Sequence, residues 1–286
     1  EETYSGSLSL LAVMKGLSKD GLTADFFINP TKVSLKDSVW SVHESKVTLA
    51  PNFLDVDRFV FECDGQQLRV DGTNSQSDKD SISVSLNSVQ LGNISDILNN
   101  KSISFDGTAN GNLSFFRLFK DPYVTGGLDI HETELNEAPL GDLELKAGWD
   151  KEDKSVMFGA NLFSVHDRAR SDIWGGVYLG NDSLFIAGDL HDVDLRFLRK
   201  YIGSILENNT GTASGQVRAY GKFGQIGLEG NPVVKDMAFD IGYLNTSYVL
   251  SDTVFMTPTS FRLNQSPVFD TEGNFALASG LVLHQG

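Results

Sequence analysis

Apolar side chains alternate with other residues along many short stretches of this chain, and that period of two constrains the fold more than any other feature. Neighbouring side chains of a β-strand point to opposite faces of a sheet, so the alternation predicts strands with one buried face and one wet face. The stretch from Gly230 to His284 carries the fullest pattern, and its apolar positions begin with Met237, Phe239, Ile241 and Tyr243. The chain is therefore expected to be all-β.

Turn signals divide the alternating stretches into hairpins. One hairpin is predicted around residues 18–21, where Ser-Lys-Asp-Gly separates two apolar runs, and another around Asp64-Gly65. Asn29-Pro30 ends the first of them, because proline cannot donate to a strand ladder. The 28 glycines suit twisted strands joined by tight turns.

The apolar period changes in one place, after the strand that ends near residue 193. Helical spacing is shown there by Leu195, Leu198, Ile202, Ile205 and Leu206. We expect an amphipathic helix over about residues 195–207, with Asp192 or Asp194 as its N-cap. Residues 93–99 are a second candidate for one or two helical turns.

Parts of the sequence recur at fixed offsets. Gly-Thr-Ala-x-Gly occurs at residues 107–111 and again, 104 residues on, at 211–215, and the same offset relates Val89 to Val193. Residues 31–40 match residues 246–255 at an offset of 215. Such recurrence predicts multi-strand modules stacked edge to edge.

The modules would comprise residues 1–72, as the end of one unit, and residues 73–180 and 181–286 as two fuller units, within one continuous domain. The expected architecture is an elongated, curved, mostly antiparallel multi-strand sheet, taco-like or an open sandwich, with one or two short amphipathic helices.

Charge and composition exclude several functions. The formal net charge is −15, so nucleic acid is an unfavourable partner. No window has the roughly 18 consecutive apolar residues of a membrane span, so the chain is expected to be soluble. Glu1 follows no basic or apolar leader segment, which indicates that a leader was removed or that the chain is part of a longer protein.

No catalytic, metal-binding or cofactor-binding motif is present, and none of these sites is expected. The polar cluster at residues 189–194 is interpreted as a solvated corner between a strand and a helix rather than as a cation site. A carbohydrate-active enzyme would need two convergent carboxylates in an aromatic cleft, which the sequence does not place. The chain is therefore predicted not to be an enzyme.

The last third resembles the C-terminal domain of TamB, the inner-membrane component of the translocation and assembly module, and more loosely the AsmA-like proteins. The resemblance lies in Gly-Asn-Pro-Val-Val at residues 230–234, Tyr-Leu-Asn-Thr-Ser-Tyr at 243–248, Ser-Asp-Thr-Val-Phe-Met-Thr-Pro at 251–258 and the closing run at 268–284. These segments look like the variant found in Bacteroides-type bacteria.

The resemblance implies a periplasmic protein of envelope biogenesis, anchored to the inner membrane in its full-length form. It also implies an outer-membrane barrel assembly protein as partner, and a role in protein translocation or phospholipid transport. We expect an apolar β groove that shields phospholipid acyl chains or unfolded β segments, lined by Met237, Phe239, Ile241, Tyr243, Leu281 and Leu283. The alternative is a structural or adhesive β-sandwich repeat with a closed core and no ligand.

Overall fold

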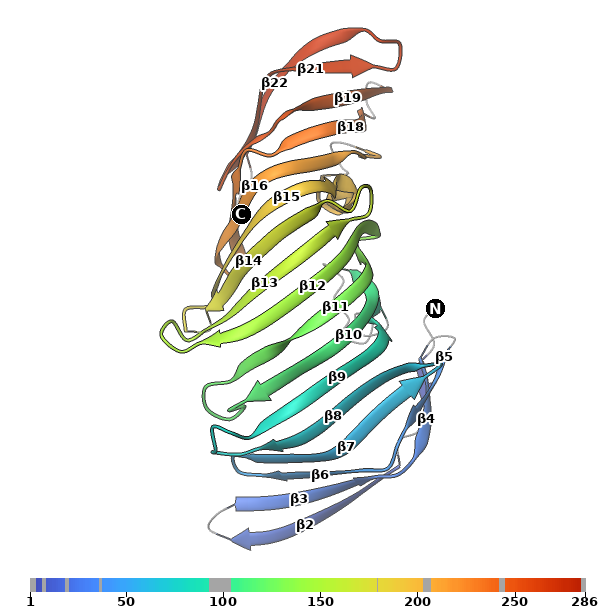
Figure 1. Cartoon of the computed structure of the whole chain (residues 1–286), viewed down its shortest axis with the longest axis vertical. Helices are drawn as coiled ribbons and strands as arrows, with labels where there is room; N and C mark the ends of the chain where they lie inside the picture. The colour runs from blue at the N-terminus through green and yellow to red at the C-terminus, as the bar shows by residue number, and fades with distance from the viewer. Residues whose placement is uncertain are drawn as a thin grey trace. The chain divides into compact units, whose positions relative to one another are not determined.

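The structure is a computed structural model that describes residues 4–6, 9–18, 21–35, 38–92, 104–178, 180–202, 207–241 and 245–283. Almost all of these residues lie in β-strands, and every strand pairing in the described ranges is antiparallel (Figure 1). The prediction of an all-β fold built from antiparallel strands is confirmed.

The chain forms two compact units. Unit 1 comprises Glu1–Ile94, Thr108–Asp129 and Lys146–Trp149, and unit 2 comprises the remaining residues. The division at residues 72 and 180 that the sequence suggests stays a prediction.

The strands of unit 1 form hairpins and meanders. They are β1 (Tyr4–Gly6), β2 (Leu10–Ser18), β3 (Gly21–Ile28), β4 (Thr31–Leu35), β5 (Ser38–Val42), β6 (Ser45–Ala50), β7 (Phe53–Cys63), β8 (Gln66–Asn74) and β9 (Ser81–Gln90). Both predicted hairpins are present, β2 with β3 and β7 with β8. Three strands contribute residues to both units: β10 (Phe105–Phe116), β11 (Tyr123–Leu135) and β12 (Ala138–Asp150).

Unit 2 contains the strands from β13 to β22. Its strands are β13 (Ser155–Ser164), β14 (Arg170–Tyr178), β15 (Ser183–Asp194), β16 (Thr212–Lys222), β17 (Gln225–Gly230), β18 (Val233–Ile241), β19 (Thr246–Thr253), β20 (Phe255–Thr257), β21 (Ser260–Asp270) and β22 (Phe275–Leu283). Each of β13 to β16 pairs with the next strand in sequence.

The predicted helix is present over residues 195–202, part of its expected range, and residues 203–206 lie outside the described residues. A 3₁₀ turn, η1 (Leu195–Leu198), leads into one turn of α-helix, α2 (Arg199–Ile202), and Asp194 is the N-cap, as predicted. The helix does not reach residue 207, because Glu207 and Asp240 exchange backbone hydrogen bonds of 3.0 and 2.8 Å in a β-bridge. The helical turns predicted at 93–99 lie outside the described residues. No helix of the described part of the chain is long and apolar enough to cross a membrane.

The 104-residue offset corresponds to a repeated structural feature, a β-bulge. Ser88 and Asp192 both have positive φ, 50° and 47°, and each precedes a buried valine. The backbone N–H of Ser88 donates to the side chain of Asn110 at 2.8 Å, and that of Asp192 donates to Ser214 at 2.9 Å. Donor and acceptor both shift by 104 residues, so this bulge and its hydrogen bond recur together.

The same arrangement occurs at four further positions of positive φ, of which Arg58, Asp236 and Gln265 lie at register shifts. A backbone N–H at positive φ again donates to a side chain on a neighbouring strand, in the pairs Arg58 with Asp71, Glu132 with Asp142, Asp236 with Ser251 and Gln265 with Ser279. A bulge leaves one backbone group outside the ladder, and these side chains satisfy it.

The 215-residue offset has no such counterpart. Residues 31–35 and 38–42 form the β4–β5 hairpin, in which Leu35 pairs with Ser38. The matching stretch from residue 246 runs straight through β19. The two segments share spacing in sequence and differ in fold.

Candidate apolar binding face

The residues predicted to line a groove lie in different surroundings. Met237 and Phe239 are only 7% and 8% exposed, and Ile241 packs against the same cluster. The buried members of that cluster are Leu195, Ala213, Val234, Met237, Phe239, Leu250 and Val268. Leu195 belongs to η1, so the short helix helps to cover this part of the sheet.

The other three predicted residues are Tyr243, Leu281 and Leu283. Tyr243 lies outside the described residues. Leu281 and Leu283 are 58% and 73% exposed on β22. Ala278, on the same strand, packs against the cluster. Leu281 and Leu283 are an odd number of residues away from it, so their side chains point to the opposite face of the sheet.

A broader apolar surface lies on β13 to β17. Cross-strand register places its side chains in three rows, because directly paired residues of antiparallel strands point to the same face. The rows are Val156, Val177, Leu184, Gly221 and Ile226; Phe158, Gly175, Ile186, Ala219 and Leu228; and Ala160, Ile173, Gly188, Val217 and Gly230. We call these fifteen positions the apolar face; none carries a polar side chain.

Glycines give the apolar face a shallow floor over which larger side chains lean. A Cβ placed on Gly175 would lie 2.9 Å from Cζ of Phe158, and one placed on Gly188 would lie 3.1 Å from Cδ2 of Leu190. A side chain at Gly175 would also collide with Phe185 O, 2.2 Å from the new Cβ, whereas one at Gly188 would require Leu190 to shift slightly. The glycines therefore allow the aromatic and branched side chains to lie flat along the sheet.

The apolar face is neither a closed core nor fully solvated. Ala160 and the two glycines 175 and 188 are buried, Leu228 is exposed, and most of the other side chains are half-buried. Ala213 belongs to the buried cluster and shares the strand and the side of Val217. The apolar face therefore continues onto the same side of the sheet as that cluster.

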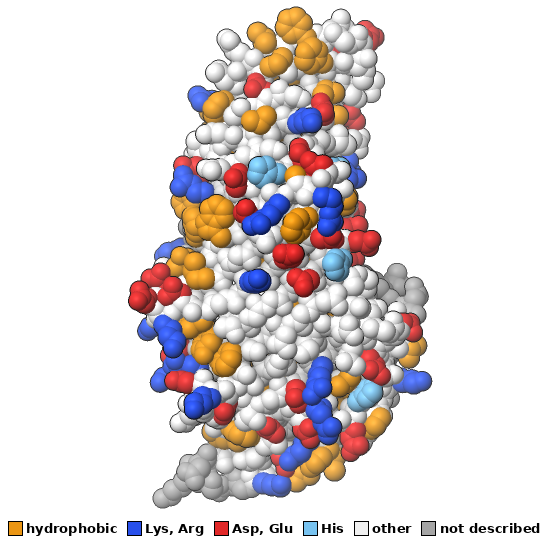
Figure 2. All heavy atoms as spheres, viewed as in Figure 1, with side chains coloured by type: hydrophobic (Ala, Val, Ile, Leu, Met, Phe, Trp, Pro, Cys, Tyr) orange, Lys and Arg blue, Asp and Glu red, His pale blue; other side chains and the backbone are white. Residues whose placement is uncertain are grey.

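The opposite face of the same strands is mixed. It bears charged residues at Asp172, Asp189, Arg218, Lys222 and Glu229. Figure 2 shows positive and negative side chains intermingled on one face of the molecule, with hydrophobic side chains in separate small groups. The two faces of these strands therefore differ sharply in polarity.

Unit 1 has the same construction on β7 to β10. One face carries Phe59, Val70, Val84 and Leu113 in one row and Val56, Gly72, Ile82 and Phe115 in another. Trp40 stacks on Phe61 at a ring separation of 4.6 Å, next to these rows. Segregation of apolar side chains to one face is thus a property of each unit by itself.

A buried carboxylate with a lowered pKa, that of Asp194, lies at the end of β15 in unit 2. Burial acts to raise the pKa of Asp194, but hydrogen bonds from the Arg196 side chain and backbone outweigh it, and the pKa is lowered. Arg196 Nη2 lies 2.7 Å from Asp194 Oδ2, and His166 Nε2 lies 3.3 Å from the same oxygen. Asp194 is 3% exposed, so the prediction of a solvated corner is wrong for this residue.

Asp194 holds the helix start in place and offers little for chemistry. Its carboxylate is already bonded to Arg196, and no group of three or more metal-ligating side chains occurs among the described residues.

The apolar face is thus the best candidate for a functional surface. Comparison of the chain with family models, with curated proteins and with solved structures finds no match.

Proposed function

We propose that the chain is a non-enzymatic envelope protein whose apolar face shields the acyl chains of phospholipids. The observation that carries the proposal is the alignment of three cross-strand rows of apolar residues and glycines on β13 to β17. The resemblance of the last third to TamB-like proteins agrees with this and suggests the periplasm as the compartment.

Acyl chains suit the apolar face better than unfolded β segments do. The backbone groups of β14 to β16 are engaged by strands on both sides, and the side chains of the rows offer no hydrogen-bonding group. A peptide laid on this face would find no hydrogen-bonding partner there, and each of its N–H and C=O groups that is shielded from water would cost roughly 1–3 kcal/mol. An acyl chain has no such groups.

The size of the apolar face also fits. Five strands at the usual spacing of about 4.8 Å span about 19 Å. Burial contributes about 0.8 kcal/mol per CH₂ group, so about ten methylenes would contribute roughly 8 kcal/mol before the cost of association.

The test compares charged substitutions on the two faces. Leu228→Glu places a carboxylate on the apolar face at a side chain that is 37% exposed, and Val249→Glu does so at a 38% exposed side chain on the other face, next to buried Leu250. Each variant is gently purified, its bound lipid is extracted and quantified, and uptake of fluorescently labelled phosphatidylethanolamine is measured. A zwitterionic lipid avoids repulsion by the net charge of −15.

We expect phospholipid to co-purify with the wild-type chain, and Leu228→Glu to lower both lipid content and uptake at least about fivefold, a loss of about 1 kcal/mol. Val249→Glu should leave both unchanged. If the wild-type chain neither carries nor takes up lipid, the structural alternative of a closed β repeat without a ligand is favoured. Equal loss in both variants would mean that face polarity does not control binding.

A further inference from the structure

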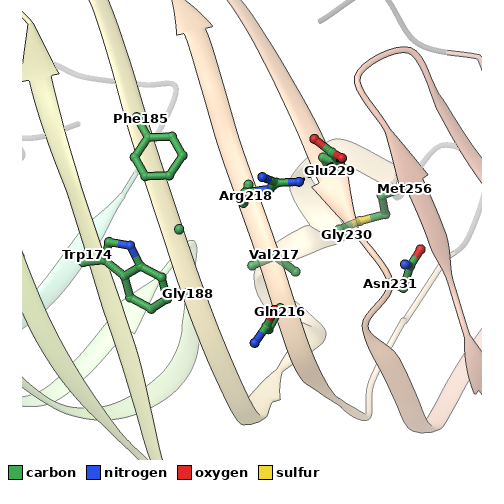
Figure 3. A pocket seen from close by; sticks show the side chains of 11 residues that line it. Trp174, Phe185, Gly188, Gln216, Val217, Arg218, Glu229, Gly230, Asn231 and Met256 are labelled. Carbon is green, nitrogen blue, oxygen red and sulfur yellow. Dashed lines mark hydrogen bonds and ion pairs between the residues drawn. The ribbon is translucent and has the colours of Figure 1, made fainter.

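A second surface, on the mixed face of unit 2, carries a pocket of about 630 Å³. Trp174, Ala187, Arg218 and Glu229 form one cross-strand row there, from β14 to β17. Figure 3 shows Trp174 and Phe185 on one side of the pocket and Arg218 with Glu229 on the other. Asn231 and Met256 close it beyond the end of β17.

Residue size along the row explains the hollow. Ala187 lies between Trp174 and Arg218, and a methyl group fills little of the space between two long side chains. Two strand spacings separate these long side chains, about 10 Å in all. Phe185 and Gln216, from the adjacent rows, bound the hollow along the strand direction.

The two charged groups of the pocket are paired with each other and balanced in charge. Arg218 Nη2 donates to Glu229 Oε1 at 3.0 Å, and the Tyr220 hydroxyl donates to Glu229 Oε2 at 3.3 Å. The side chains of Arg218 and Glu229 remain 55% and 38% exposed, so both can still bond to a ligand. Gln216 adds an amide with donors and an acceptor.

The aromatic side of the pocket is open. Trp174 is 46% exposed, although a tryptophan side chain is usually highly buried. An exposed indole ring presents a flat apolar surface. A ligand would thus meet the flat indole ring on one side and hydrogen-bond donors and acceptors on the other.

We propose that this pocket binds a carbohydrate, with a sugar ring stacked on Trp174 and its hydroxyl groups bonded to Arg218, Glu229 and Gln216. A sugar ring has C–H groups on its faces and hydroxyls at its edge, which matches this division. A simple anion or cation fits less well, because the guanidinium and the carboxylate neutralise each other. An acyl chain would offer no hydrogen-bonding partner to the polar side chains of the pocket.

The sugar is bound and not cleaved. Glycoside hydrolysis generally uses two carboxylates flanking the scissile bond. Glu229 is the single carboxylate among the eleven pocket residues, and it is held by Arg218 and Tyr220. The pocket is therefore a recognition site on the mixed face, although Gly188, Val217 and Gly230 of the apolar face also line it.

The experiment uses the full chain labelled with 5-fluorotryptophan, because Trp174 is the only tryptophan of unit 2. The probes are the trimers of N-acetylglucosamine, glucose and mannose, with choline as a cationic comparison, each titrated to millimolar concentration. The ¹⁹F resonance of Trp174 reports contact, and calorimetry gives the dissociation constant. Trp174→Ala removes the indole ring, and Gln216→Ala removes one amide. The control is Phe223→Ala, at a 52% exposed side chain in the β16–β17 turn.

We expect saturable binding of at least one sugar, weakened about tenfold or more by Trp174→Ala and less by Gln216→Ala, with Phe223→Ala unchanged. Binding of choline in place of every sugar would overturn the proposal, as would binding by Trp174→Ala at wild-type affinity. Absence of any saturable change with all three sugars would also overturn it. Lipid uptake by Trp174→Ala is expected at the wild-type level, which separates this test from that of the apolar face.

Discussion

Asp194 provides the sharpest test of how unit 2 is held together. Asp194→Asn keeps an oxygen that can accept from the Arg196 backbone N–H, now 2.8 Å away, but removes the charge that binds the Arg196 side chain. Hydrogen bonds to charged groups contribute about 1.5–3 kcal/mol. Arg196 is 35% exposed and regains water, so the lower part of that range applies, roughly 2 kcal/mol. Asp194→Ala also loses the helix cap, which adds about 1 kcal/mol, for roughly 3 kcal/mol in total.

The measurement is urea unfolding followed by the ¹⁹F signal of Trp174, with Asp172→Asn as control. Asp172 pairs with Arg170 at the surface, and such pairs contribute about 0–1 kcal/mol. The pKa of Asp194 is lowered by folding, so its contribution is present above the ordinary carboxyl pKa of 3.8 and is lost as the pH falls through the folded pKa. The gap between wild type and Asp194→Asn should therefore close in acid. Equal stability of Asp194→Asn and Asp172→Asn at neutral pH would refute this reasoning.

Three further outcomes are expected. Leu250→Ala, at a side chain 3% exposed in the unit 2 cluster, should lower the free energy of unfolding by about 3 kcal/mol in urea titrations. Gly111→Ala should lower it by more than about 2 kcal/mol, because φ is 142° and the new Cβ would lie 2.2 Å from Gly127 O, whereas Gly148→Ala, facing open space, should change it by less than about 0.5 kcal/mol. The hydrogen bond from Lys15 is the main reason that the pKa of Asp25 is lowered to about 2, so the wild type should lose stability between about pH 4 and pH 2 as this carboxylate is protonated. Asp25→Asn has no such carboxylate, and thermal melts should show a smaller loss of stability for it over the same pH range.

The hairpins and one repeat were predictable because their causes are local. Ser-Lys-Asp-Gly at residues 18–21 and Asp64-Gly65 are turn sequences, and the chain reverses at both. The offset of 104 corresponds to a recurring bulge with its own hydrogen-bonding side chain at Asn110 and Ser214. The conformation of a turn is determined by a few residues and can therefore be predicted from the sequence around it.

The position of the apolar surface was harder to predict, for two physical reasons. Glycines 175, 188 and 221 interrupt the apolar rows in sequence, although in the sheet the side chains of Phe158 and Leu190 lie over the first two. Bulges also change which face a residue occupies, and a positive φ at Gln265 cannot be recognised from its residue type. The predicted set therefore mixed buried Met237 with exposed Leu283 on the other face.

The bulges have a consequence for how such a chain can grow. A strand that slips by one residue exchanges its faces, which here would turn apolar rows to water and charges inward. Each bulge resists slippage, because its backbone N–H is satisfied only when the correct partner, such as Ser214 for Asp192, is opposite it. A duplicated segment of 104 residues brings donor and acceptor together. New copies of the module can thus be added during evolution without a shift of strand register that accumulates from strand to strand.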